Sequence, residues 1–299
     1  MAVAEPFVSP GAQRRGLSKR SGQRLSGLGK VFTGATKIDR FGLILLGVLV
    51  LLAVLAPLIA PYNPIDPSGI PFTSPLHGGH LLGTDEVGYD IFSRVLFGLR
   101  TSLLGVLIVV SSGVIIGGTI GLVAGVAGGW LDTLLMRITD LFLALPGPLL
   151  AIAIAAALGP SYAHVLLSVS IVWWPFYARI MRGEVRALAA RPHLEAAALA
   201  GAGPVRRGLR HLLPGAMPAI IVTASLDVGN LVVTLAGLSF LGLGAPAPAP
   251  ELGAMAARGL QVLLQQWWVP VMPGIAVALL ALGANLAGDA VADATGQGI

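Results

Sequence analysis

The sequence predicts an all-α fold, a polytopic bundle of six transmembrane helices. Hydrophobic residues make up 55% of the 299 and charged residues only 11%, which excludes a soluble globular domain of ordinary composition. Five long apolar runs hold at most one charged residue each: Phe41–Tyr62, Thr101–Leu131, Leu141–Ala178, Leu212–Pro250 and Gly259–Gly288. About 20 apolar residues cross the hydrocarbon as a helix, and the third run is long enough for two spans. We therefore expect spans at 41–60, 102–127, 133–157, 163–181, 216–240 and 267–289.

Basic residues predict the orientation of these spans. Two groups of them precede the first span and follow the fourth: Arg14, Arg15, Lys19, Arg20, Arg24, Lys30, Lys37 and Arg40, then Arg182, Arg186, Arg191, Arg206, Arg207 and Arg210. Six spans place both groups on one side, which the positive-inside rule makes cytoplasmic. We expect a multi-pass protein of the cell (inner or plasma) membrane with cytoplasmic N- and C-termini. The net charge of +5 comes with no basic stripe interleaved with aromatics, so no nucleic-acid partner is expected.

Three regions are expected along the chain. Residues 1–38, rich in Ser, Gly and Arg, predict a disordered basic cytoplasmic tail. Residues 39–100 hold the first span and an extracytoplasmic segment that ends in a short amphipathic helix over Ile91–Leu99. Residues 101–295 form a five-span core, with a cytoplasmic hairpin at 182–218.

Three carboxylates, Asp85, Glu86 and Asp90, cluster in the extracytoplasmic segment. No histidine or further carboxylate in the sequence pattern completes a cation shell, so turn and helix-cap roles are favoured over a metal site. We expect no bound metal.

Four glycines, Gly113, Gly117, Gly121 and Gly125, recur at every fourth residue of the second span. Small residues at this spacing form a ridge on which another transmembrane helix packs closely. Two interpretations stay open. The ridge is a moving seam or an interface with a second subunit, or it is a static contact within the chain.

Asp227 is an acidic residue well inside the fifth span, and Asn230 lies on the same helix face. Ionisable groups at this depth are costly and usually face a water-filled path or a partner group. Both residues are candidates for the translocation path, with a buried helix–helix contact as the equal alternative. We also expect Arg137 to pair with Asp140 three residues on, and Trp173, Trp174 and Tyr177 to form an interfacial belt.

The loop after the fourth span predicts two short helices. Pro192 opens the first, and Gly201 with Gly203 closes it. Pro204 opens the second, and Pro214 ends it. Each is too short to be stable alone in water, so we expect the pair to dock on another surface.

This loop resembles the EAA loop of ABC importer permeases. The matching residues are Glu195, Ala196, Ala197, Gly201, Leu213 and Pro214. Further motifs resemble the dipeptide, oligopeptide and nickel branch, from Leu82 to Arg94 (with Tyr89 where the pattern has Arg), from Leu238 to Gly244, and from Asn285 to Asp293. The resemblance covers about Phe41 to Asp293.

The resemblance implies a type I ABC importer permease fold and a share of the translocation path for di- or oligopeptides or a related small solute. It implies a homologous second permease subunit, two cytoplasmic ATPase subunits, an extracytoplasmic substrate-binding protein and the lipid bilayer as partners. The chain itself holds no P-loop, so ATP and Mg²⁺ are expected on the ATPases and no catalytic site or cofactor on this chain. Two alternatives remain: an ion-coupled secondary transporter using Asp227, and a non-transporting membrane scaffold.

Overall fold

The computed structural model describes residues 36–192, 194 and 199–295. Regular secondary structure within these residues is helical, apart from isolated bridges in the segment 60–90. The long helices are α2 (Lys37–Ile59), α3 (Ile91–Ala127), α4 (Gly129–Leu143), α5 (Gly147–Leu158), α6 (Tyr162–Ala189), α9 (Leu213–Leu238) and α11 (Trp268–Ala294). The described part of the chain confirms the predicted all-α bundle.

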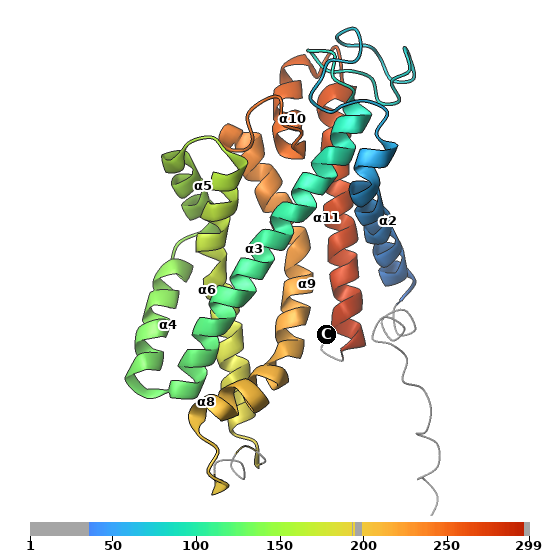
Figure 1. Cartoon of the computed structure of the whole chain (residues 1–299). Coiled ribbons are helices and arrows are strands. Elements are labelled where there is room, and N and C mark those ends of the chain that lie inside the picture. Colours follow the sequence, from blue (N-terminus) through green and yellow to red (C-terminus); the bar gives the residue numbers. More distant parts are fainter. Residues whose placement is uncertain (1–35, 193, 195–198, 296–299) are drawn as a thin grey trace, which may run out of the picture.

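The helices pack side by side along one long axis (Figure 1). The most extensive contact joins α3 to α6, and α11 packs against both α9 and α2. The helix α2 begins with a capping box, in which Thr36 and Asp39 bond each other's backbone N–H groups. We call the end that carries α10 (Leu252–Gly259) and the segment 60–90 the cap end. The opposite end, where α8 (Pro204–Arg207) lies, is the hairpin end.

The helix predicted over Ile91–Leu99 is the first part of α3, which has 37 residues and continues through the second span. At 1.5 Å per residue it is about 55 Å long, well beyond the ~30 Å hydrocarbon core. No proline or turn glycine separates the predicted short helix from the second span.

The third predicted span is bent. Helices α4 and α5 meet at 82° across Ala144–Pro146. Pro146 has an extended backbone and no N–H, so the helix of α4 ends before it. Within the described ranges, five helices are long and apolar enough to cross a membrane, and the bent pair makes a sixth if it counts as one span.

The hairpin boundaries also differ from expectation. The helix α6 continues past Arg182 to Ala189, so the hairpin begins later than predicted. Pro214 does not end a helix, because α8, a π-turn (Gly208–Leu212) and α9 follow without a break. Pro214 lies in the first turn of α9, where no intrahelical N–H is needed.

Two groups of buried side chains hold the bundle together. The larger one fills the space between α3, α5, α6, α9 and α11. The smaller one lies at the hairpin end and consists of Met181, Val185, Leu188, Leu194, Leu212, Ala216 and Ile220. The smaller group matters for function because it connects the hairpin to α6 and α9.

Candidate functional site

The hairpin is fixed to the bundle by two leucines. Leu194 and Leu212 are both 4% exposed and pack with Val185 of α6 and Ile220 of α9. Burying a leucine stabilises a contact by about 1.5–3 kcal/mol. Glu195, Ala196 and Ala197, the core of the predicted motif, lie outside the described residues.

The remaining hairpin residues of the motif are described. Gly201 is exposed and has φ +81°, a left-handed conformation that favours glycine. A Cβ added there meets no atom within 4 Å, so the position faces open space. Leu213 packs against the buried group at the hairpin end, and Pro214 follows it. Gly201 therefore lies on the exposed surface of the hairpin, whereas Leu213 holds the loop against the buried group at the hairpin end.

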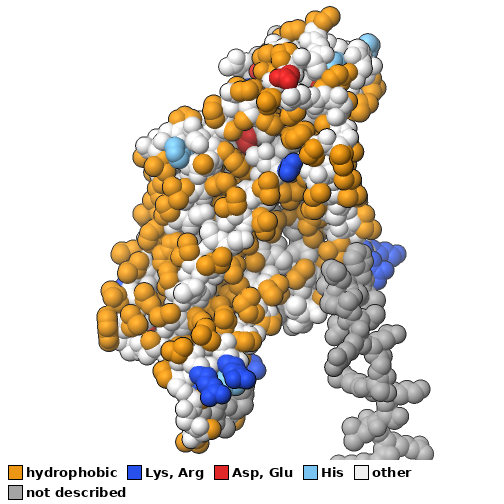
Figure 2. All heavy atoms as spheres, viewed as in Figure 1, with side chains coloured by type: hydrophobic (Ala, Val, Ile, Leu, Met, Phe, Trp, Pro, Cys, Tyr) orange, Lys and Arg blue, Asp and Glu red, His pale blue; other side chains and the backbone are white. Residues whose placement is uncertain are grey.

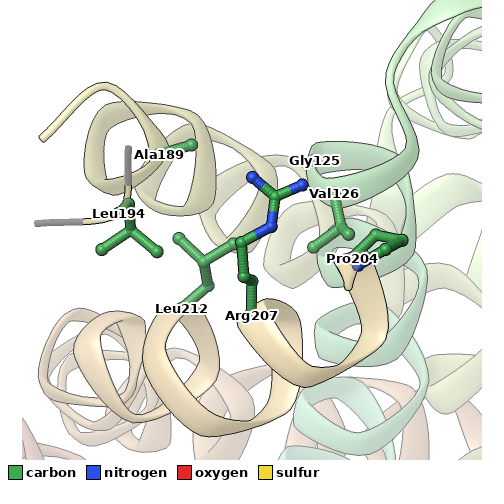
Figure 3. A pocket seen from close by; sticks show the side chains of 7 residues that line it. All are labelled: Gly125, Val126, Ala189, Leu194, Pro204, Arg207 and Leu212. Atoms are coloured by element: carbon green, nitrogen blue, oxygen red, sulfur yellow. The ribbon is translucent and has the colours of Figure 1, made fainter. Parts of the chain in front are cut away.

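A small cavity of about 70 Å³ lies between the hairpin and the ends of α3 and α6. Figure 3 shows the guanidinium group of Arg207 reaching between Val126, Ala189 and Leu194. Its Nε atom is buried and has no hydrogen-bond partner among the residues that the structure describes.

The glycine ridge lies against α6 of the same chain. A Cβ at Gly113 would come within 2.9 Å of the Tyr177 ring, and one at Gly117 or Gly121 would overlap the carbonyl oxygens of Trp174 or Ala178. At Gly125 it would lie 2.6 Å from Val185 Cγ1. The ridge therefore contacts α6 of the same chain, and its role as a moving seam or a static contact stays a prediction.

Asp227 is buried, with 6% of its surface exposed. Its Oδ2 atom accepts hydrogen bonds from Trp173 Nε1 and, at 3.1 Å, from Tyr177 Oη, both on α6. Asn230 is exposed. The carboxylate thus joins α9 to α6, and the predicted aromatic belt is wrong for Tyr177, which is fully buried.

Ion pairs along α4 and α6 were missed or misassigned by the sequence analysis. Asp140 pairs with Arg179, 2.5 Å away, and not with Arg137. Asp132 is 4% exposed and accepts from Arg182, at 2.5 and 2.8 Å, and from Arg186. The partners are about 40 to 50 residues apart, so local spacing gave no signal for them.

Two of the three clustered carboxylates, Asp85 and Asp90, take the turn and helix-cap roles that were favoured. Asp90 accepts the Ser93 N–H at the start of α3 and a bond from His80 Nδ1, 2.9 Å away. Asp85 Oδ1 accepts the N–H groups of Val87 and Tyr89. Burial raises the pKa of Asp85 although Arg94 opposes the shift. Among the described residues, no three acidic or histidine side chains are grouped to hold a metal ion.

Glu251 is the buried N-cap residue of α10. It is 1% exposed and accepts the N–H groups of Gly253 and Ala254. Burial raises the pKa of its carboxyl, and the two N–H bonds oppose the shift. Glu251 therefore fixes the short helix that packs on α11.

Comparison with known proteins places these features in a family. Residues 117–299 match the model described as binding-protein-dependent transport system inner membrane component, and residues 37–75 match the N-terminal TM domain of oligopeptide transport permease C. The chain is 40% identical, over 84% of each chain, to the probable D,D-dipeptide transport system permease protein DdpC of Escherichia coli.

Two further relatives have related names. The dipeptide transport system permease protein DppC of Alkalihalophilus pseudofirmus is 39% identical over 86% of this chain and 85% of its own. The glutathione transport system permease protein GsiD of Pectobacterium atrosepticum is 42% identical over 72% and 71%. This chain belongs to the family of binding-protein-dependent transport system inner membrane components.

Proposed function

We propose that this protein is a permease subunit of an ATP-driven importer and forms half of the translocation path for small peptides. The observation that carries the proposal is the identity of about 40% over most of the chain to permeases named for D,D-dipeptides and dipeptides. The relative named for glutathione fits the same substrate class, short peptides with free carboxylates.

The energy for import comes from partner subunits. Two ATPase subunits in the cytoplasm bind ATP and Mg²⁺, a second permease subunit completes the path, and a substrate-binding protein delivers the peptide on the other side. The hairpin end is cytoplasmic, as are both termini. Figure 2 shows Lys and Arg side chains gathered at the hairpin end and beside the start of α2, a surface rich in hydrophobic side chains above them, and a further basic side chain nearer the cap end. This distribution supports the orientation.

The hairpin couples the ATPases to the spans. The helix α6 runs unbroken to Ala189 just before the hairpin, and α8 at the other side of the hairpin continues into α9. Leu194 and Leu212 hold the arms together at their base. A helix pair attached in this way moves with α6 and α9 when an ATPase pushes or pulls it.

Uptake of labelled peptides by cells with and without the gene tests the substrate class. We expect uptake of di- and tripeptides to depend on the chain, and uptake of a free amino acid to be unaffected. Uptake of a nickel chelate in place of peptides would overturn the substrate while keeping the permease. A gradient-driven uptake that persists in ATP-depleted cells would favour the ion-coupled alternative through Asp227.

Co-purification of an ATPase with the tagged permease tests the coupling role. We expect Glu195→Arg and Gly201→Trp to lose the ATPase while the variants still insert into the membrane. Gly183→Trp is the matched control, because a Cβ at Gly183 also meets open space but lies on α6 outside the hairpin. Retention of the ATPase by both hairpin variants would overturn the coupling assignment.

A further inference from the structure

A strip of polar side chains runs along α4 and α6 in the half of the bundle near the hairpin end. On α4 it consists of Thr133, Arg137 and Asp140, which are spaced by four and three residues and so share one helix face. On α6 it consists of Arg179, Arg182 and Arg186. Asp140–Arg179 and Asp132–Arg182 join the two helices. We call the six residues the polar strip.

The strip is exposed although it lies along helices of the membrane bundle. The side chains of Arg179 and Asp140 are 57% and 52% exposed. Asp140 follows the turn at Gly128 by twelve residues, which is about 18 Å along a helix. Arg179 lies ten residues before the end of α6, about 15 Å from it. Both charges are therefore several turns away from the hairpin end.

Lipid is a poor neighbour for this surface. A charged side chain in the hydrocarbon costs at least about 2.5 kcal/mol, and such groups face protein or water. Helix α4 also exposes Leu134, Ile138 and Leu141. Each of these follows a strip residue by one position, so the apolar face lies beside the polar one. An amphipathic helix of this kind separates an apolar medium from a polar one.

We infer that the polar strip lines the aqueous translocation path, and that the Asp140–Arg179 ion pair is the part of the strip farthest from the hairpin end. The inference rests on the proposed function and extends it, because it moves the path from Asp227, which is buried between α6 and α9, to the outer faces of α4 and α6. A peptide zwitterion carries one group of each charge, and the pair offers a partner to both.

The chain contains no cysteine, so single cysteines report on their own position. Thr133→Cys and Arg137→Cys sample the strip. Val123→Cys and Thr119→Cys are matched controls on α3, because they precede the Gly128 turn by the same five and nine residues and are also exposed. Gly183→Cys is a further probe, on α6 directly after the strip residue Arg182, where an added Cβ would meet no described atom within 4 Å.

The assembled complex is treated in inverted vesicles with a membrane-impermeant cationic methanethiosulfonate. We expect the strip cysteines to react at least about tenfold faster than the controls, because a cationic reagent does not enter hydrocarbon, and we expect modification to block the ATP-driven release of peptide from the vesicle lumen. Variants are scored when they insert into the membrane at the wild-type level, because the labelling rate does not depend on uptake.

Two outcomes overturn the inference. If the strip cysteines react with the reagent as slowly as the α3 controls, the strip faces lipid. If they are protected from the reagent until the permease subunits are separated, the strip lies in a subunit interface. The labelling experiment needs no substrate, so it tests the position of the strip even if the transported solute is not a peptide. Uptake that does not depend on the chain would instead overturn the proposed function.

Discussion

Tyr177 donates a hydrogen bond from its hydroxyl to Asp227 Oδ2, 3.1 Å away, and so joins α6 to α9. The ring of the same tyrosine packs on Gly113 of α3, and its Cβ lies against Gly117. One buried side chain thus connects the acidic residue of the fifth span to the glycine ridge of the second. Three helices therefore meet at this side chain, and the carboxylate of Asp227 has a partner inside the bundle.

Replacing Tyr177 by Phe is expected to destabilise the protein modestly. The ring keeps its contact with the glycines, and Asp227 keeps its bond from Trp173. Hydrogen bonds between membrane helices contribute about 0.6 to 1.7 kcal/mol. Thermal unfolding in detergent should show a lower midpoint for Tyr177→Phe, while peptide uptake persists.

The substitution Asp227→Asn distinguishes a structural role of Asp227 from a role in binding a coupling ion. The amide keeps an acceptor oxygen for Trp173 and Tyr177 but has no charge with which to bind a proton or cation. We expect uptake to continue and to remain dependent on ATP. Complete loss of uptake in a variant that is folded and inserted would contradict the structural role.

Gly117→Ala is expected to be among the most disruptive small changes in α3. Its Cβ would overlap the Trp174 carbonyl oxygen, which belongs to the backbone and cannot turn away. Overpacking of this kind costs about 1–3 kcal/mol. Gly118→Ala is the neighbouring control, since its Cβ would lie 3.5 Å from the flexible end of Met181. Equal unfolding midpoints for the two variants would show that the α3–α6 contact yields easily.

The spans were predictable from sequence because hydropathy acts over some 20 residues and averages out local detail. The roles of Asp85 and Asp90 were predictable because turns and helix caps are local. Asp140 shows the limit. Its neighbour Arg137 has ideal spacing for an ion pair, yet Arg179 is the partner because α6 packs beside α4.

Pro214 shows a second limit of sequence-based prediction. A proline is a reliable breaker inside a regular helix. It was expected to end the second hairpin helix, but the π-turn over Gly208–Leu212 precedes it and the helical course continues. Since no residue pattern marks a π-turn, the boundary between hairpin and fifth span could not be found from the sequence.

Glu251 is expected to make stability depend on pH at the cap end. Burial raises its pKa in the folded state above the ordinary value of 4.5. The folded protein then binds the proton more tightly than the unfolded chain, so this group's contribution to stability falls as pH rises from 4.5 through the raised pKa. Glu251→Gln should remove this part of the pH dependence.

The measurement that checks this prediction is the difference in unfolding midpoint between wild type and Glu251→Gln, followed across that pH range. A difference that stays constant, or one that grows in favour of wild type as pH rises, would contradict the assignment.

Gly201→Ala is expected to weaken docking of the hairpin without adding bulk. With φ +81° at this position, a Cβ costs about 1–2 kcal/mol of backbone strain, although it touches nothing in the chain. Gly203 has φ −63°, which any residue adopts, so Gly203→Ala is the matched control. A penalty of about 1.4 kcal/mol lowers the population of the native loop conformation relative to alternatives by about tenfold. The amount of ATPase retained during purification of the permease should therefore fall for Gly201→Ala and stay unchanged for Gly203→Ala.

Equal losses of ATPase in both variants would mean that the ATPase surface tolerates no added side-chain atom at the tip of the hairpin. Equal retention would mean that the left-handed turn is not needed for docking, since only backbone strain distinguishes the two alanines.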